Sequence, residues 1–138
     1  MTGGRKQNCG SGVQLGRLRK AEQFYESAGI IADLADDGAD VGDAYVTLLV
    51  HAGVAASDVV CCAGLGHHAQ GENHAEAVNL LNKIDESLGK HLGALLRMKT
   101  GAGYSHLPVK PDERKRALRA ATALLVAARK APRGTNGQ

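Results

Sequence analysis

The fold is decided by residues 41–64, which read VGDAYVTLLVHAGVAASDVVCCAG. Apolar and small residues recur along this stretch at steps of three and four, the spacing that builds one face of a helix. Between Val41 and Cys62 the only formally charged side chains are those of Asp43 and Asp58. A helix that is apolar on nearly all sides is normally buried by its neighbours. We therefore predict that this segment is the central helix of the protein.

The rest of the chain contains four more segments with helical spacing of apolar residues. They cover about residues 13–36, 73–84, 86–100 and 111–130. The last segment begins with Pro111 followed by two acidic residues, a combination that favours the first turn of a helix. No segment alternates apolar and polar residues for long enough to require a strand.

Helices joined by short connections indicate a bundle. We predict an all-α, up-and-down bundle of four long helices and one short helix over residues 13–130. The Gly-rich and polar residues 1–12 and 131–138 are expected to be flexible tails. Residues 65–73 are expected to form a loop. The 138 residues are the length of one domain.

Cysteine content and hydropathy favour a cytoplasmic protein. The three cysteines, Cys9, Cys61 and Cys62, form no even disulfide framework, so we expect reduced thiols. No apolar region follows the basic N-terminal residues, as a secretory signal requires. No uninterrupted apolar run approaches the roughly 18 residues of a membrane span, so no membrane partner is expected.

The net charge of +3 is unevenly distributed along the chain. Residues 21–60 carry eight acids and no bases, whereas residues 87–138 carry eleven bases and two acids. The basic segment can face an anion such as nucleic acid. Alternatively, it can balance the acidic segment within the same bundle or in a second copy.

Two stretches of the sequence resemble the HEPN superfamily (higher eukaryotes and prokaryotes nucleotide-binding). Residues 18–28, LRKAEQFYESA, look like the opening helix of that family, with a basic-Ala-acidic start before an aromatic residue. Residues 95–104, LLRMKTGAGY, look like its penultimate helix. The resemblance covers about residues 14–130. It implies a HEPN-like helical bundle that commonly pairs as a homodimer.

The resemblance also implies a function around RNA or nucleotides. The pattern Lys99, Ala102, Tyr104 occurs in HEPN proteins that look like non-catalytic partners of nucleotidyltransferases. We therefore expect a non-catalytic or degenerate member that binds a partner, such as a nucleotidyltransferase-type protein, in a toxin–antitoxin or defence-like setting. A ligand-free dimeric scaffold or adaptor is an alternative.

A metal-independent endoribonuclease is the second alternative, so the sequence leaves enzyme activity open. Many HEPN ribonucleases carry an Arg followed, after four to six residues, by a His. Here Arg97 is followed by eight residues before His106, which departs from that spacing. These two residues would form the catalytic pair across a dimer interface.

Several cations are candidates for binding phosphate or RNA. Lys99 and Tyr104 lie beside the Arg97–His106 pair in sequence, and their side chains suit a phosphate. The alternative is that the cations at this position cap the negative end of a helix. Arg114, Lys115 and Arg119 can contact a nucleic-acid backbone or form a solvated helix face.

We expect no metal and no cofactor. The histidines of the loop, His67, His68 and His74, lie near the adjacent Cys61 and Cys62, but their spacing matches no standard zinc pattern. Surface histidines and buried, inert thiols are the preferred interpretation. On the central helix, His51 and Asp58 are seven residues apart, too far for a direct hydrogen bond. His51 is therefore expected to be a core or interface histidine.

Overall fold

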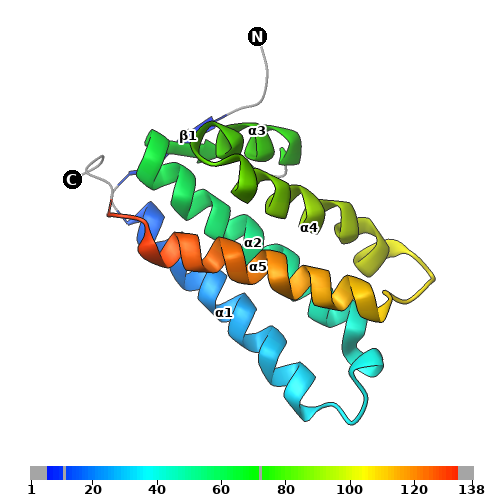
Figure 1. The fold of residues 1–138 in the computed structure, drawn as a ribbon. Helices are drawn as coiled ribbons and strands as arrows, with labels where there is room; N and C mark the ends of the chain where they lie inside the picture. Colours follow the sequence, from blue (N-terminus) through cyan, green and yellow to red (C-terminus); the bar gives the residue numbers. More distant parts are fainter. Residues whose placement is uncertain (1–5, 11, 72, 134–138) are drawn as a thin grey trace.

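In its described residues the protein has five α-helices beside a small antiparallel sheet of two strands (Figure 1). The structure, a computed structural model, describes residues 6–10, 12–71 and 73–133. The elements in chain order are β1 (Lys6–Asn8), α1 (Val13–Leu34), the short 3-10 helix η1 (Gly38–Val41), α2 (Gly42–Leu65), β2 (His67–Ala69), α3 (His74–Ile84), α4 (Glu86–Tyr104) and α5 (Pro111–Lys130). The all-α prediction is confirmed.

Helix α2 is the centre of the molecule, as its sequence predicts. It packs against α1, α3, α4, α5 and β2, and Figure 1 shows it running between α1 and α4 behind α5. By length and composition alone, the segment Gly38–Leu65 is apolar enough to cross a membrane, with a mean hydropathy of 1.8 in its best window. However, 72% of that window is buried inside the bundle, as is typical of the core helix of a folded domain.

Small residues let the helices approach one another closely. Ala21 and Ala28 of α1 and Ala117 and Ala121 of α5 are completely buried. At Gly53 of α2, an added Cβ would overlap Cδ1 of Leu95 and lie 3.2 Å from Cδ1 of Leu124, so only glycine fits there. The large core side chains are leucines, among them Leu49, Leu80, Leu92, Leu95 and Leu124. A core of alanine and leucine explains how a chain with few aromatics fills its interior.

Most of the predicted helix ends agree with the structure to within two residues. Helix α5 begins and ends where the sequence predicts, and the backbone N–H of Lys110 donates to Oε1 of Glu113 across its first turn (2.8 Å). Helix α4 runs to Tyr104 rather than to residue 100, because Gly101 and Gly103 continue the helix. A helix interior tolerates glycine at a cost of roughly 1 kcal/mol each.

The two-stranded sheet corrects the expectation of a helical protein without strands. β1 and β2 pair antiparallel, with Gln7 opposite His68, and the N–H of Cys9 donates to the carbonyl of Gly66 (3.0 Å). Part of the predicted N-terminal tail and part of the predicted loop 65–73 are therefore ordered. Strands of three residues are too short to show alternation. Residues 1–5, 11 and 134–138 of the predicted tails lie outside the described residues.

Candidate functional site

A cavity of about 440 Å³ lies beside the β1–β2 sheet, where β1, β2 and α3 meet α1, α2 and α4. Val50 and Val54 of α2 give it an apolar wall. The ionisable side chains that line it among the described residues are Arg17, His51, Asp58, His68, His74 and Lys99. Two cations and three histidines thus surround a single carboxylate, which favours an anionic ligand. We call this cavity the hairpin pocket, a label that refers only to the antiparallel pair β1–β2, whose strands are separated in the chain by α1 and α2.

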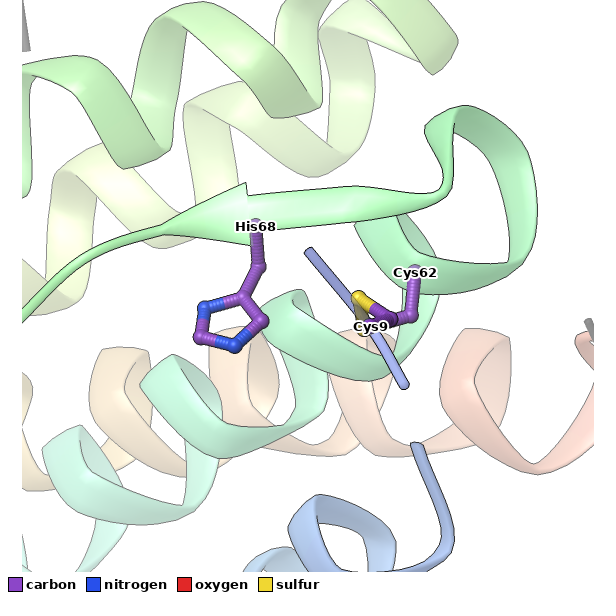
Figure 2. Close-up of side chains that lie close together, drawn as sticks. All are labelled: Cys9, Cys62 and His68. Atoms are coloured by element: carbon purple, nitrogen blue, oxygen red, sulfur yellow. A yellow bond between two sulfur atoms is a disulfide. The ribbon is translucent and has the colours of Figure 1, made fainter. Parts of the chain in front are cut away.

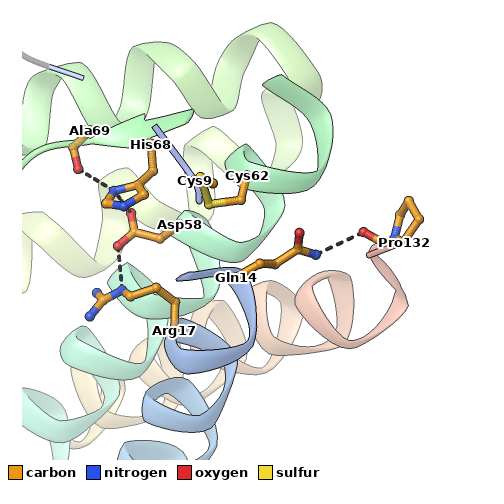
Figure 3. Close-up of a disulfide and its surroundings, with 8 residues drawn as sticks. All are labelled: Cys9, Gln14, Arg17, Asp58, Cys62, His68, Ala69 and Pro132. Atoms are coloured by element: carbon orange, nitrogen blue, oxygen red, sulfur yellow. Dashed lines mark hydrogen bonds and ion pairs between the residues drawn. A yellow bond between two sulfur atoms is a disulfide. The ribbon is translucent and has the colours of Figure 1, made fainter. Parts of the chain in front are cut away.

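A part-buried ion pair lines the hairpin pocket. Asp58 is only 7% exposed, and Nε of Arg17 donates to its Oδ2 at 2.9 Å (Figure 3). Nδ1 of His68 lies 3.6 Å from Oδ1 of Asp58 and 2.7 Å from the carbonyl oxygen of Ala69. The three elements α1, α2 and β2 are therefore joined through one carboxylate.

Burial governs the chemistry of that carboxylate. Desolvation raises the pKa of Asp58, and the charges of His68 and Arg17 and the hydrogen bond from Arg17 only partly oppose this rise. A carboxylate held away from water needs its partners, because an unpaired buried charge is strongly destabilising. Arg17 is thus bound to Asp58 through Nε, while no hydrogen bond of its terminal nitrogens is found in the described part of the chain.

Lys99 and His74 also line the hairpin pocket. Nζ of Lys99, on α4, lies 3.1 Å from Nε2 of His74, the first residue of α3. Val13, the first residue of α1, also lines the pocket, and α1 has no acidic residue in its first turn and no side-chain cap. The uncapped N-terminal end of α1 therefore borders the cavity and favours an anion, whereas the start of α3 is capped by Asn73 and carries Glu76 in its first turn.

His51 lies on the wall of the hairpin pocket rather than in the core. It is exposed, and its ring centroid is 5.3 Å from that of Phe24 on α1. Of the two places expected for His51, the core is therefore wrong, and the interface stays a prediction. The expected lack of a direct bond to Asp58 agrees with the structure, since Asp58 is bonded to Arg17 instead.

The predicted catalytic residues Arg97 and His106 lie in different surroundings. Arg97 is exposed on α4 and borders a shallow depression of about 240 Å³ with Asn82 and Lys90. His106 lies beyond the end of α4 in an exposed connector, and Tyr104 is 80% exposed. Within the described residues of one chain, no hydrogen bond or ion pair joins Arg97 to His106.

The cations of α5 lie in two settings. Arg114 and Lys115 line a second cavity of about 290 Å³ with Tyr45, while Arg119 is exposed. Gly42 allows the close approach of Arg114, since an added Cβ there would lie 3.3 Å from its Cδ. None of these three cations lines the hairpin pocket.

The uneven charge of the chain is partly balanced inside the bundle. Nε of Arg129, near the end of α5, donates to Oε2 of Glu22 on α1 at 3.0 Å. Arg17 and Asp58 form a second pair between a basic and an acidic segment. These pairs favour the interpretation that basic and acidic segments face each other within one chain.

Cys9 and Cys62 form a disulfide, which corrects the expectation of three reduced thiols. Their Cα atoms are 5.6 Å apart although 53 positions separate them in sequence. Cys9 lies next to the last turn of α2 because β1 pairs with β2. Since this pairing joins distant parts of the chain, no local sequence pattern indicates the disulfide. Cys61 remains a free thiol and is 2% exposed, as the prediction of a buried thiol requires.

Cys61 is expected to resist alkylation while the protein is folded. Burial raises the pKa of its thiol to about 12, and the nearby Asp58 adds to the rise. At pH 8 only about one thiol in ten thousand would then be the reactive thiolate. Iodoacetamide followed by mass spectrometry should label no cysteine of the native, unreduced protein and one cysteine after denaturation. Labelling of Cys61 in the native protein at the rate of a free peptide thiol would contradict its burial.

The loop histidines are not all at the surface. His68 is 7% exposed, and Nε2 of His67 is buried without a hydrogen-bond partner among the described residues. The expectation of surface histidines is therefore wrong for His68. Glu72, which the sequence places near them, lies outside the described residues.

Sequence reasoning missed Arg17 and the role of Asp58. The signal for Asp58 is present, since it is one of two carboxylates on an otherwise apolar helix. A buried carboxylate needs a partner, but the partner Arg17 lies 41 residues away and leaves no local pattern.

Comparisons with known proteins give no neighbour for this chain. No family model, no curated protein and no solved structure matches it.

Proposed function

We propose that this chain is a non-catalytic, HEPN-like helical protein that binds a phosphate group of a nucleotide or RNA in the hairpin pocket. The observation that carries this proposal is the placement of Arg17, in the first turns of α1, and Lys99, on α4, around one cavity. Guanidinium and ammonium groups are the side chains that bind phosphate oxygens best.

The size and polarity of the cavity support a small organic phosphate. Its volume of about 440 Å³ falls within the range of roughly 300–1,000 Å³ that small-molecule sites occupy. Val50 and Val54 offer an apolar surface for a base or sugar, and His51 offers a ring beside them. A nucleoside monophosphate thus has a match for each of its parts.

The candidate catalytic pair lies away from the hairpin pocket. The ribonuclease alternative needs a second copy of the chain to bring Arg97 and His106 to one phosphate across a dimer interface. In a single chain they border different surroundings, and neither lines the hairpin pocket. Lys99 is the one predicted phosphate-binding residue that does line it.

The proposal includes a homodimer or a protein partner such as a nucleotidyltransferase. Exposed apolar side chains support it, since Ile30 and Leu34 at the end of α1 are 57% and 80% exposed and Leu107 is 63% exposed. Exposed apolar residues that lie together often mark an interaction surface. A cytoplasmic location stays part of the proposal, although the disulfide removes the support that reduced cysteines would give.

Calorimetric titration with a nucleoside monophosphate tests the phosphate site. We expect the wild type to bind the nucleotide and not the matching nucleoside. Lys99→Met, which keeps the apolar stem, should weaken binding at least about 10-fold, because a charged hydrogen bond is worth roughly 1.5–3 kcal/mol. The matched control is Arg97→Met on the same helix, which should bind as the wild type does. Equal binding of nucleotide and nucleoside would contradict the proposal.

A cleavage assay separates the proposal from the ribonuclease alternative. Single-stranded RNA is incubated in chelator with the wild type and with an Arg97→Ala/His106→Ala double variant. We expect neither protein to cleave. Cleavage by the wild type alone would replace the binding proposal with a metal-independent ribonuclease.

A further inference from the structure

We propose that Cys9, Cys62 and His68 form a zinc site when the disulfide between the two cysteines is reduced. One donor atom from each of these three residues lies within 4.8 Å of the other two, and all three residues are buried (Figure 2). Two thiolates and an imidazole are a donor set that zinc prefers. This inference is independent of the proposed phosphate ligand.

The imidazole of His68 is already oriented as a metal ligand. Its Nδ1 lies 2.7 Å from the carbonyl oxygen of Ala69 and therefore carries the proton, which it also directs toward Asp58 at 3.6 Å. The unprotonated Nε2 is then available to a metal. Metal-bound histidines are typically held by such a carbonyl or carboxylate at the other ring nitrogen, which fixes the ring and its tautomer (Figure 3).

The backbone fixes all three donors independently of the disulfide. Cys62 is on the last turn of α2, and His68 follows on β2. Cys9 comes directly after β1, whose ladder with β2 sets its position. In a tetrahedral zinc site, Zn–S bonds of about 2.3 Å place the two sulfurs about 3.8 Å apart. Rotation of the two side chains can give this separation with Cα atoms 5.6 Å apart.

Conversion of the disulfide form into the zinc-bound form needs a reductant and releases protons. A dithiol of the cellular reducing system transfers two electrons to the Cys9–Cys62 bond and becomes a disulfide itself, leaving two thiols. Zn²⁺ then replaces the two thiol protons, which pass to solvent. Two thiolates balance the charge of the ion in this buried place. Because three protein donors leave a fourth position, water reaches the ion from the hairpin pocket, which His68 lines.

Cys61 is the matched control for this site. It is next to Cys62 and equally buried, yet it is not part of the three-donor cluster. Neighbouring residues of a helix point about 100° apart. A Cys61→Ala variant should therefore keep the metal site intact.

Cobalt substitution of the reduced full-length protein tests the inference. The protein is reduced with a phosphine, freed of reductant without air, and titrated with Co²⁺ while thiolate-to-cobalt charge-transfer absorption is recorded. We expect one Co²⁺ per chain, displaced by Zn²⁺, in the wild type and in Cys61→Ala. The oxidised protein and Cys9→Ser should give no such absorption, and His68→Asn should bind at least about 10-fold more weakly.

Two results would overturn the zinc site. One is a reduced wild type that shows no thiolate absorption with Co²⁺. The other is His68→Asn with the affinity of the wild type, which would show that His68 is no ligand. Circular dichroism of each variant checks that a loss of cobalt binding is not caused by unfolding. Comparing cobalt binding by the reduced and the oxidised wild type tests the site without any substitution. Failure here leaves the nucleotide titration unaffected, since that titration uses the oxidised protein.

Discussion

Replacing Leu95 by alanine should lower the free energy of unfolding by about 2–5 kcal/mol, the range for leucines in tightly packed cores. Leu95 is completely buried on α4 and fills the space above Gly53 of α2. Removal of its branched end leaves a cavity between two helices that cannot close without moving α4. Chemical denaturation followed by circular dichroism measures the change, and a loss below about 1 kcal/mol would contradict the packing.

A double-mutant cycle makes this prediction specific to the α2–α4 contact. Gly53→Ala alone should destabilise the protein, because its Cβ would overlap Cδ1 of Leu95. In a Leu95→Ala background the same substitution enters the cavity and should cost much less. The two losses should therefore not add, as expected for side chains in direct contact. Additive losses would show that Gly53 and Leu95 do not meet.

Loss of the disulfide should lower the free energy of unfolding by about 2–4 kcal/mol, because the bond closes a long loop. The bond joins positions 53 residues apart and ties β1 to the end of α2. Cys9→Ser and reduction of the wild type should therefore give similar denaturation midpoints, both below that of the oxidised wild type. The helices of the reduced protein should remain folded, since the leucine core does not depend on the bond.

Cys61→Ala is the control, because it removes a sulfur from the same turn of α2 without opening the loop. Its denaturation midpoint should still fall when reductant is added, as that of the wild type does. If reductant leaves the midpoint of the wild type unchanged, Cys9 and Cys62 are not joined in the folded protein.

The helices of this protein could be predicted from the sequence because helical spacing is a local signal. The apolar residues of α2 predicted its ends within one residue, and Pro111 with the two acids after it predicted the start of α5. The end of α4 was missed, since Gly101 and Gly103 suggested a connector that the structure shows as helix. The β1–β2 sheet was missed because each strand has three residues and the two strands are far apart in the sequence.

The hairpin pocket depends on that same long-range pairing. Lys99 was predicted from the sequence as a phosphate-binding residue, and it does line the pocket. Arg17 and His68 were not predicted, because they meet at Asp58 only after α1 and β2 pack against α2. Because this polar cluster is assembled from separate elements, the only sequence signal for it is Asp58, a carboxylate on an apolar helix.

The most direct test of the phosphate site is a two-dimensional NMR titration of the isotope-labelled, oxidised protein with a nucleoside monophosphate. We predict shifts centred on His51, His74 and Lys99, with none along Arg114–Arg119 of α5. Shifts centred on Arg97 and His106, or on α5, would contradict binding in the hairpin pocket, and so would a spectrum that does not change.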